Sequence, residues 1–139
     1  MHIEHVAIWT DNIALLKTFH ENYFEARAVE KHTNAGKRSE SSFFSLPDGA
    51  SFERMRVSGL LESSRRKYPL SGNVHQTFSI GSRTVFDAFI ARLQADGCRV
   101  IDEPRHAGAC YCESGMLDPN GNRIELNRED HPGDRGCKI

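Results

Sequence analysis

The chain has 139 residues, of which 38% are hydrophobic and 27% are charged, the size and composition of one ordinary globular domain. Lysine and arginine (18) nearly cancel aspartate and glutamate (19), and a net charge of −1 argues against a nucleic acid or an anionic membrane as a partner. No apolar run approaches the roughly 20 residues of a membrane helix, and the first residues do not have the pattern of a secretory signal. We therefore expect a cytoplasmic protein.

The first half of the chain predicts a strand, a helix and a meander of about three strands. His5 lies in the strand-like run IEHVAIWT. A helix is expected to begin at Asp11, a good N-cap residue. The turn LPDG then leads into the strand ASFERM, which carries Glu53. The apolar stripe of the predicted helix consists of Ile13, Leu16, Phe19 and Tyr23.

The second half predicts the same elements in the same order. His75 lies in the strand-like run NVHQTFSI, and a helix is expected to begin at Ser82 and to end before Gly97. The turn DPNG leads into the strand NRIELN, which carries Glu125. The apolar stripe of this helix consists of Val85, Phe86, Phe89, Ile90 and Leu93.

The chain is therefore read as an internal repeat. His75 follows His5 by 70 residues, and Glu125 follows Glu53 by 72. Two offsets that agree this closely indicate two related modules. The predicted organisation is one domain over 1–130, with module one over about 1–68, module two over about 70–130, and a flexible tail over 131–139.

The repeated histidines and glutamates indicate a metal site. A carboxylate in the middle of a strand is costly among core-forming residues unless it is paired or bound to a metal. A pseudo-twofold fold brings equivalent positions together, so His5, Glu53, His75 and Glu125 are expected to converge. Imidazole and carboxylate ligands suit Zn, Ni, Co, Mn or Fe as divalent ions. The remaining histidines have no repeat partner and are expected at the surface; they are His2, His20, His32, His106 and His131.

The motifs IEHVAIW, VHQTFSIGS and LDPNGNRIEL resemble the vicinal oxygen chelate superfamily over nearly the whole chain. This superfamily contains glyoxalase I, extradiol dioxygenases, methylmalonyl-CoA epimerase and the fosfomycin and bleomycin resistance proteins. The resemblance implies an α+β fold in which two paired βαβββ modules form a curled mixed sheet around a metal cleft. It also implies a divalent metal ion on His5, Glu53, His75 and Glu125, and a homodimer.

A four-ligand set resembles that of glyoxalase I-like members. The resemblance implies a metal-dependent lyase or isomerase, similar to lactoylglutathione lyase, that acts on a small vicinal-oxygen substrate of the α-oxo thiohemiacetal type through a metal-bound enediolate. Glu125 is the expected main base, and Glu53 a ligand or second acid/base. Trp9 stands where many glyoxalase I sequences have an arginine that binds glutathione, so it is the expected substrate-binding residue.

Two other readings stay open. An iron-dependent extradiol-type dioxygenase would use His5, His75 and Glu125, with Glu53 outside the ligand set. A non-catalytic protein would instead hold an apolar small molecule or an antibiotic in the cleft. For the lyase or isomerase, the resemblance to glyoxalase I implies a small-molecule substrate such as a glutathione adduct.

Overall fold

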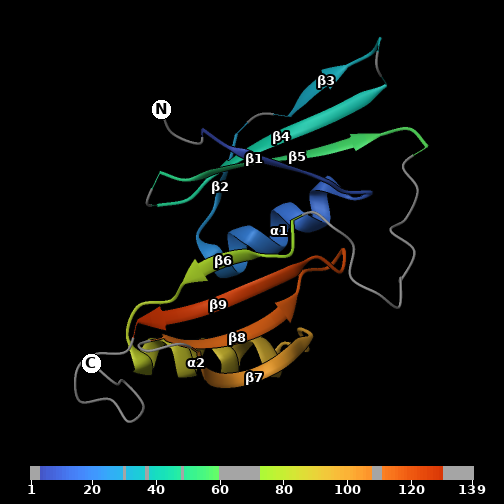
Figure 1. The fold of residues 1–139 in the computed structure, drawn as a ribbon. Coiled ribbons are helices and arrows are strands. Elements are labelled where there is room, and N and C mark those ends of the chain that lie inside the picture. Colours follow the sequence, from blue (N-terminus) through green and yellow to red (C-terminus); the bar gives the residue numbers. More distant parts are fainter. Residues whose placement is uncertain are drawn as a thin grey trace. The chain divides into compact units, whose positions relative to one another are not determined.

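The computed structural model describes residues 4–29, 31–36, 38–47, 49–59, 73–107 and 111–129. The tail predicted over 131–139 lies outside these residues. The chain divides into two compact units, Met1–Leu70 and Ser71–Ile139. Each unit has one helix and one mixed sheet (Figure 1).

Unit 1 is built around a mixed sheet in which the first strand pairs with the last. The strand order is β1-β5-β4-β2, and β3 also pairs with β4. β1 runs parallel to β5, and the other pairs are antiparallel. The elements are β1 (Val6–Trp9), α1 (Ile13–Phe24), β2 (Arg27–Ala28), β3 (His32–Asn34), β4 (Ser39–Ser45) and β5 (Ser51–Val57).

Unit 2 repeats this topology. Its strand order is β6-β9-β8-β7, with β6 parallel to β9 and the remaining pairs antiparallel. The predicted α+β class, with a strand, a helix and a meander in each module, is confirmed. The elements are β6 (Gln76–Ser79), α2 (Arg83–Ala95), β7 (Val100–Ala107), β8 (Tyr111–Leu117) and β9 (Arg123–Glu129).

The two helices begin with different caps. The expected start of α1 at Asp11 is wrong, because the side chain of Asn12 accepts the capping hydrogen bond from the Leu15 N–H at 2.9 Å. α2 does begin after Ser82, whose side chain makes no capping hydrogen bond. Gly97 follows α2 with a φ of 76°, the left-handed conformation expected of a glycine after a helix. Neither described helix is long and apolar enough to cross a bilayer.

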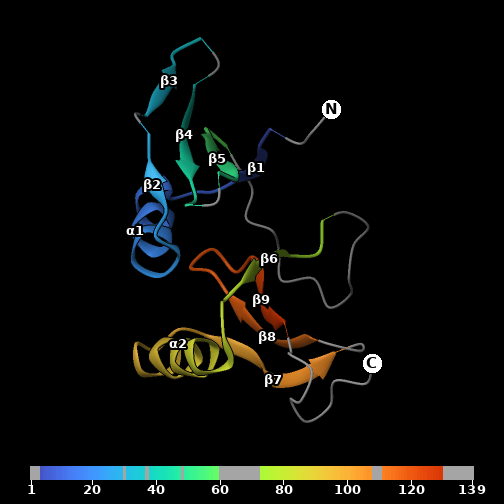
Figure 2. The same ribbon diagram turned by 90° about the vertical axis from the view of Figure 1, so that its left-hand side faces the viewer.

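Each helix covers one face of its own sheet (Figure 1 and Figure 2). Alternate strand residues point to opposite faces, so one face is apolar and lies under the helix while the other is left for polar side chains. Glu53 and Glu125 belong to these other faces, since their neighbours Arg54 and Leu126 are the fully buried ones. The buried apolar residues of unit 2 are Phe78, Phe86, Ile90, Leu93, Cys112, Met116, Ile124 and Leu126.

The interior of unit 1 contains a histidine and an arginine where unit 2 is apolar. His20 was expected at the surface, but only 1% of it is exposed, and its Nδ1–H donates to the Leu16 carbonyl at 2.9 Å. The fully buried Arg54 guanidinium lies 4.3 Å from the centre of the Phe44 ring. Burial, and then the positive charge of Arg54, lower the pKa of His20 to about 3, so the imidazole is neutral.

Two further histidines have the expected exposure, and two cannot be placed. His32 and His106 are exposed, whereas His2 and His131 lie outside the described residues.

The offsets of the repeat match His20 to Ile90 and Arg54 to Leu126. Two polar positions in the interior of unit 1 therefore correspond to apolar positions of unit 2.

Candidate metal centre

In unit 1, the parallel pairing of β1 and β5 brings His5 to Glu53. The register places Ala7 directly beside Glu53, and His5 precedes Ala7 by two residues on the same face. The His5 Nε2 atom lies 3.7 Å from the Glu53 Oε2 atom. The two side chains are 32% and 14% exposed, so the pair is accessible to a small ligand without lying free in solvent.

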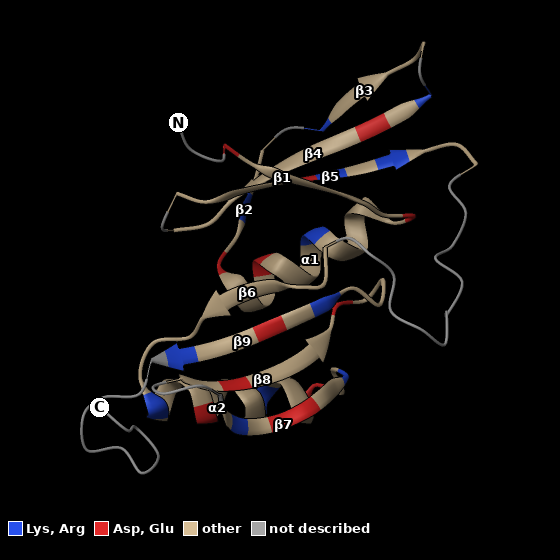
Figure 3. Cartoon of the chain, viewed as in Figure 1, with Lys and Arg blue, Asp and Glu red and all other residues tan. Residues whose placement is uncertain are grey.

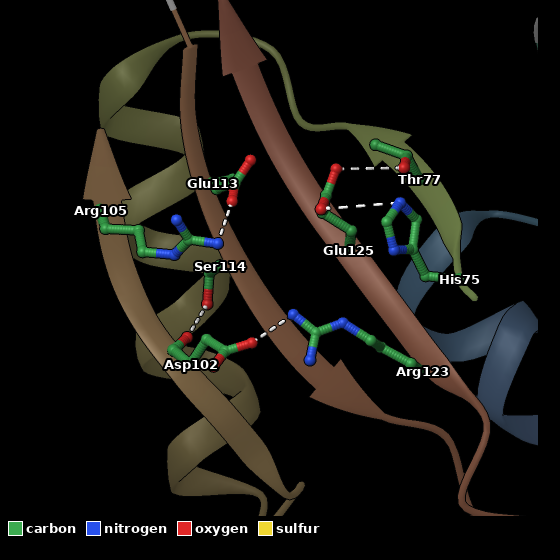
Figure 4. A network of polar contacts seen from close by, with 8 residues as sticks. All are labelled: His75, Thr77, Asp102, Arg105, Glu113, Ser114, Arg123 and Glu125. Atoms are coloured by element: carbon green, nitrogen blue, oxygen red, sulfur yellow. Dashed lines mark hydrogen bonds and ion pairs between the residues drawn. The ribbon is translucent and has the colours of Figure 1, made fainter. Parts of the chain in front are cut away.

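In unit 2, β6 and β9 bring His75 to Glu125 in the same way. Thr77 lies directly beside Glu125, and His75 precedes Thr77 by two residues. The His75 Nε2 atom lies 3.7 Å from the Glu125 Oε2 atom, and the side chains are 34% and 17% exposed (Figure 4). The structure therefore brings the predicted site residues together as two pairs of equal geometry.

The two pairs are held by different neighbours. The Glu4 carboxylate contacts Nδ1 of His5, which leaves Nε2 directed to Glu53. The Thr77 hydroxyl donates to Oε1 of Glu125 at 3.2 Å. Neither neighbour was predicted as part of the site. Strand alternation alone does not show that Glu4, which precedes β1, turns back to the ring of the next residue.

His75 differs from a histidine whose ring nitrogens are hydrogen-bonded within the protein core. Its Nδ1 atom is buried and finds no hydrogen-bond partner among the residues that the structure describes. A buried imidazole that serves only packing normally makes a hydrogen bond through one nitrogen. The ring of His75 instead presents Nε2 to a carboxylate, which is the arrangement of a potential ligand.

The faces around the pairs differ in chemistry. In unit 1 the rings of Phe43 and His5 lie nearly perpendicular to each other, with ring centres 5.1 Å apart. Trp9 lies on the same face of β1 as His5, is 52% exposed and pairs with Met55. The surroundings of His5 on this face are therefore aromatic and include the residue predicted to bind substrate, while serines such as Ser41, Ser45 and Ser51 occupy other positions of the same face.

The corresponding face of unit 2 is charged. Arg123 forms an ion pair with Asp102, and Arg105 forms one with Glu113 (Figure 4). Basic and acidic residues follow one another along β9 (Figure 3), and Arg123 lies two residues before Glu125 on the same face of this strand. A substrate that touches this face would meet charged and hydrogen-bonding groups.

The chemistry and spacing of both pairs fit a divalent ion. Two ligands that each lie about 2.1 Å from one ion are separated by roughly 3 to 4 Å, the range in which both 3.7 Å contacts fall. Within neither unit do the described residues gather three or more candidate metal ligands. A catalytic zinc site has three protein ligands, whereas each pair supplies two.

The chain belongs to the glyoxalase/bleomycin resistance protein/dioxygenase superfamily, whose family model matches residues 2–126. The resemblance stated from the motifs is thereby confirmed. The sequence has no match among curated proteins.

Solved structures of the same fold include enzymes of this superfamily. The glyoxylase/bleomycin resistance protein/dioxygenase domain from Frankia sp. EAN1pec is 16% identical, with a TM-score of 0.74 over 93% of this chain and 98% of that chain. A glyoxalase family protein from Bacillus cereus is 17% identical, with a TM-score of 0.75 over 94% and 95%. A variant of the fosfomycin resistance protein FosX from Listeria monocytogenes, complexed with Mn(II) and 1S,2S-dihydroxypropylphosphonic acid, is 21% identical, with a TM-score of 0.67 over 92% of each chain.

Proposed function

We propose that this protein is a metal-dependent, glyoxalase I-like lyase or isomerase that acts on a small substrate with two adjacent oxygens. The ligands would be His5, Glu53, His75 and Glu125, contributed by one chain or by two copies of it. The observation that carries this proposal is the equal pairing of an imidazole Nε2 and a carboxylate Oε2, 3.7 Å apart, in both units. Such repetition is expected if both pairs serve one function.

The two carboxylates favour proton transfer over oxygen activation. A divalent ion bound here would supply positive charge that polarises two adjacent substrate oxygens. Glu125 would take the proton from one substrate carbon and return it to the neighbouring carbon, so that the substrate is isomerised without an external oxidant. Glu53 would be a ligand or the second acid/base. The dioxygenase reading places Glu53 outside the ligand set, whereas Glu53 faces His5 at the same distance as Glu125 faces His75.

The substrate class proposed first is an α-oxo thiohemiacetal, such as a glutathione adduct. Trp9 would contact the substrate, because it is exposed on the face that carries His5 and Glu53. An indole at this position offers an apolar surface and one N–H donor, which suits the carbon skeleton of an adduct more than its carboxylates.

The experiment loads the protein with a metal ion and then measures its turnover of substrate. Protein stripped with a chelator and reloaded with Ni²⁺, Zn²⁺ or Mn²⁺ is assayed with the hemithioacetal of methylglyoxal and glutathione, and bound metal is measured by elemental analysis. We expect about one ion per set of four ligands and turnover by the loaded protein. Metal binding without turnover would refute this substrate, and a protein that binds no metal would favour the non-catalytic reading.

A second candidate substrate is a small phosphonate. The FosX structure cited above, which contains Mn(II) and a dihydroxypropyl phosphonate, supports it. On the face around Glu125, a phosphonate would share Arg123 and Arg105 with their partners Asp102 and Glu113. The Mn²⁺-loaded protein is therefore also tested with fosfomycin, whose conversion is followed by phosphorus NMR.

We also propose a homodimer, and a mixing experiment shows which chains supply the ligands. His5→Ala and His75→Ala variants are each expected to be inactive. If ligand pairs come from two copies, mixing the unfolded variants and refolding them together restores one intact site per mixed dimer. If both pairs come from one chain, the mixture stays inactive.

A further inference from the structure

The two ligand pairs have the same geometry, but their carboxylates are not held alike. The residue beside Glu53 in the parallel register is Ala7, which has no hydrogen-bonding side chain. The residue beside Glu125 is Thr77, whose hydroxyl donates to Oε1 of that carboxylate at 3.2 Å. The repeat has thus placed a hydroxyl beside one carboxylate only.

The other neighbours of Glu125 do not take over this role. On the opposite side, in β8, the register places Gly115, which has no side chain. Arg123 lies two residues away on the same face, but its guanidinium forms an ion pair with Asp102. Among the described residues, Thr77 is the sole side chain that donates a hydrogen bond to Glu125 within 3.5 Å.

The hydroxyl and the imidazole engage different oxygens of the same carboxylate. Thr77 contacts Oε1, and Oε2 is the oxygen 3.7 Å from Nε2 of His75 (Figure 4). A carboxylate fixed at one oxygen has less freedom to turn its other oxygen away. The contact of 3.2 Å is longer than usual for a hydroxyl donor, and such contacts in unliganded sites commonly shorten when the ligand binds.

We propose that Thr77 is a positioning residue that holds Glu125 in the orientation in which it shares a metal ion with His75. The inference rests on the proposed function in that Glu125 is a metal ligand. Unit 1 orients its histidine through Glu4, whereas unit 2 orients its glutamate through Thr77. Groups that orient metal ligands in this way typically contribute about 10-fold to 100-fold to metal affinity.

The test compares three variants of the full chain by calorimetric titration with Ni²⁺. Thr77→Val keeps the shape of the side chain and removes the hydroxyl, and Thr77→Ser keeps the hydroxyl. Ser79→Ala is the matched control, because Ser79 lies two residues further along β6 on the same face and is exposed. Thr77 is itself exposed and valine favours strands, so Thr77→Val is expected to fold; circular dichroism and thermal unfolding verify this.

We expect Thr77→Val to bind Ni²⁺ about tenfold more weakly, while Thr77→Ser and Ser79→Ala bind within about twofold of the wild type. Equal affinity of Thr77→Val and the wild type would overturn the inference while leaving the proposed function intact. The inference would also be overturned if Ser79→Ala or Thr77→Ser lost as much Ni²⁺ affinity as Thr77→Val. Absence of Ni²⁺ binding by the wild type would instead contradict the proposed function.

Discussion

Gly115 lies directly opposite Glu125 in the antiparallel pair of β8 and β9, and its missing side chain leaves the space in which Asp102 meets Arg123. A β-carbon added at Gly115 would overlap the Asp102 carboxylate and lie 3.1 Å from the Arg123 guanidinium. The side chains of Asp102 and Arg123 therefore meet over the backbone of Gly115. The hydroxyl of Ser114 supports this arrangement by donating to the Asp102 carbonyl at 2.8 Å.

The first prediction is that Gly115→Ala displaces this ion pair. The added methyl group would meet the charged ends of Asp102 and Arg123, which are partly exposed and can move aside, so we expect a loss of about 0.2 to 1 kcal/mol of unfolding free energy, the contribution of an exposed ion pair. Urea denaturation measures the loss. Gly36→Ala is the control, because a β-carbon there would meet only one side-chain oxygen, at an ordinary 3.6 Å. Equal stability of Gly115→Ala and the wild type would show that Asp102 and Arg123 do not need this space.

The second prediction concerns the proposed main base. Glu125→Gln keeps the size of the side chain but removes its charge and its capacity to accept a proton. We expect turnover of the loaded protein to fall about 10²-fold to 10⁴-fold, with the circular dichroism spectrum unchanged. Glu113→Gln alters a carboxylate on the neighbouring strand that pairs with Arg105 instead of His75, and is expected to retain turnover. A similar loss in both variants would argue against a specific role for Glu125.

The third prediction is that Glu4 orients His5. In Glu4→Gln the carboxylate that contacts Nδ1 is lost, and we expect Ni²⁺ affinity to fall about tenfold, at the lower end for such groups because Glu4 is exposed. Val74 precedes His75 as Glu4 precedes His5, and it is also exposed. Val74→Glu is therefore expected to tighten Ni²⁺ binding. Unchanged affinity of Glu4→Gln would exclude Glu4 from this role.

The fourth prediction follows from the neutral His20. Its pKa in the folded protein is about 3, whereas a histidine in an unfolded chain titrates near about 6.5. Between these values the unfolded chain binds a proton that the folded protein does not, so stability falls as the pH is lowered from about 6.5 towards 3. Above about 6.5, His20 makes no pH-dependent contribution.

His20→Ile, which copies Ile90 of unit 2, removes this source of acid sensitivity. We expect its unfolding free energy to decline less than that of the wild type between about pH 7 and about pH 4, by at most about 1.4 kcal/mol per pH unit. Carboxylates contribute in both proteins, among them Glu40, whose pKa is lowered by the hydrogen bond from Lys31. If the unfolding free energies of the two proteins decline equally as the pH is lowered, His20 binds a proton as readily in the folded protein as in the unfolded chain, and the prediction is wrong. His32→Gln, at an exposed position, is the control.

The fold was largely predictable because the two halves of the sequence contain the same predicted elements in the same order. The strand that carries His5 and the strand that carries His75 are followed by equivalent apolar stripes. In the stripe predicted for α2, Phe86, Ile90 and Leu93 are buried, whereas Val85 is 54% exposed. The stripe of α1 was incomplete, since a histidine counts as polar in such a pattern. Comparison with Ile90 is the signal that would have placed His20 in the interior.

The partners of the site residues were not predictable from the pattern. Which residue lies beside Glu53 or Glu125 depends on the register of a parallel pair whose strands are far apart in sequence. A sequence of alternating residues does not fix that register, so the contact between Thr77 and Glu125 follows only from the pairing of β6 and β9. The four predicted metal ligands remain a proposal that the loading experiment tests.

The parallel pairing described above also shows where the chain can change length. Two more residues separate Thr77 from Glu125 than separate Ala7 from Glu53. The distance from the histidine Nε2 to the glutamate Oε2 is nevertheless 3.7 Å in both units. The difference is absorbed by the helix, the turns and the antiparallel strands between them. Insertions in those segments therefore need not disturb the imidazole and the carboxylate, so the chain can change length there, by evolution or by design, while each histidine and glutamate stay together.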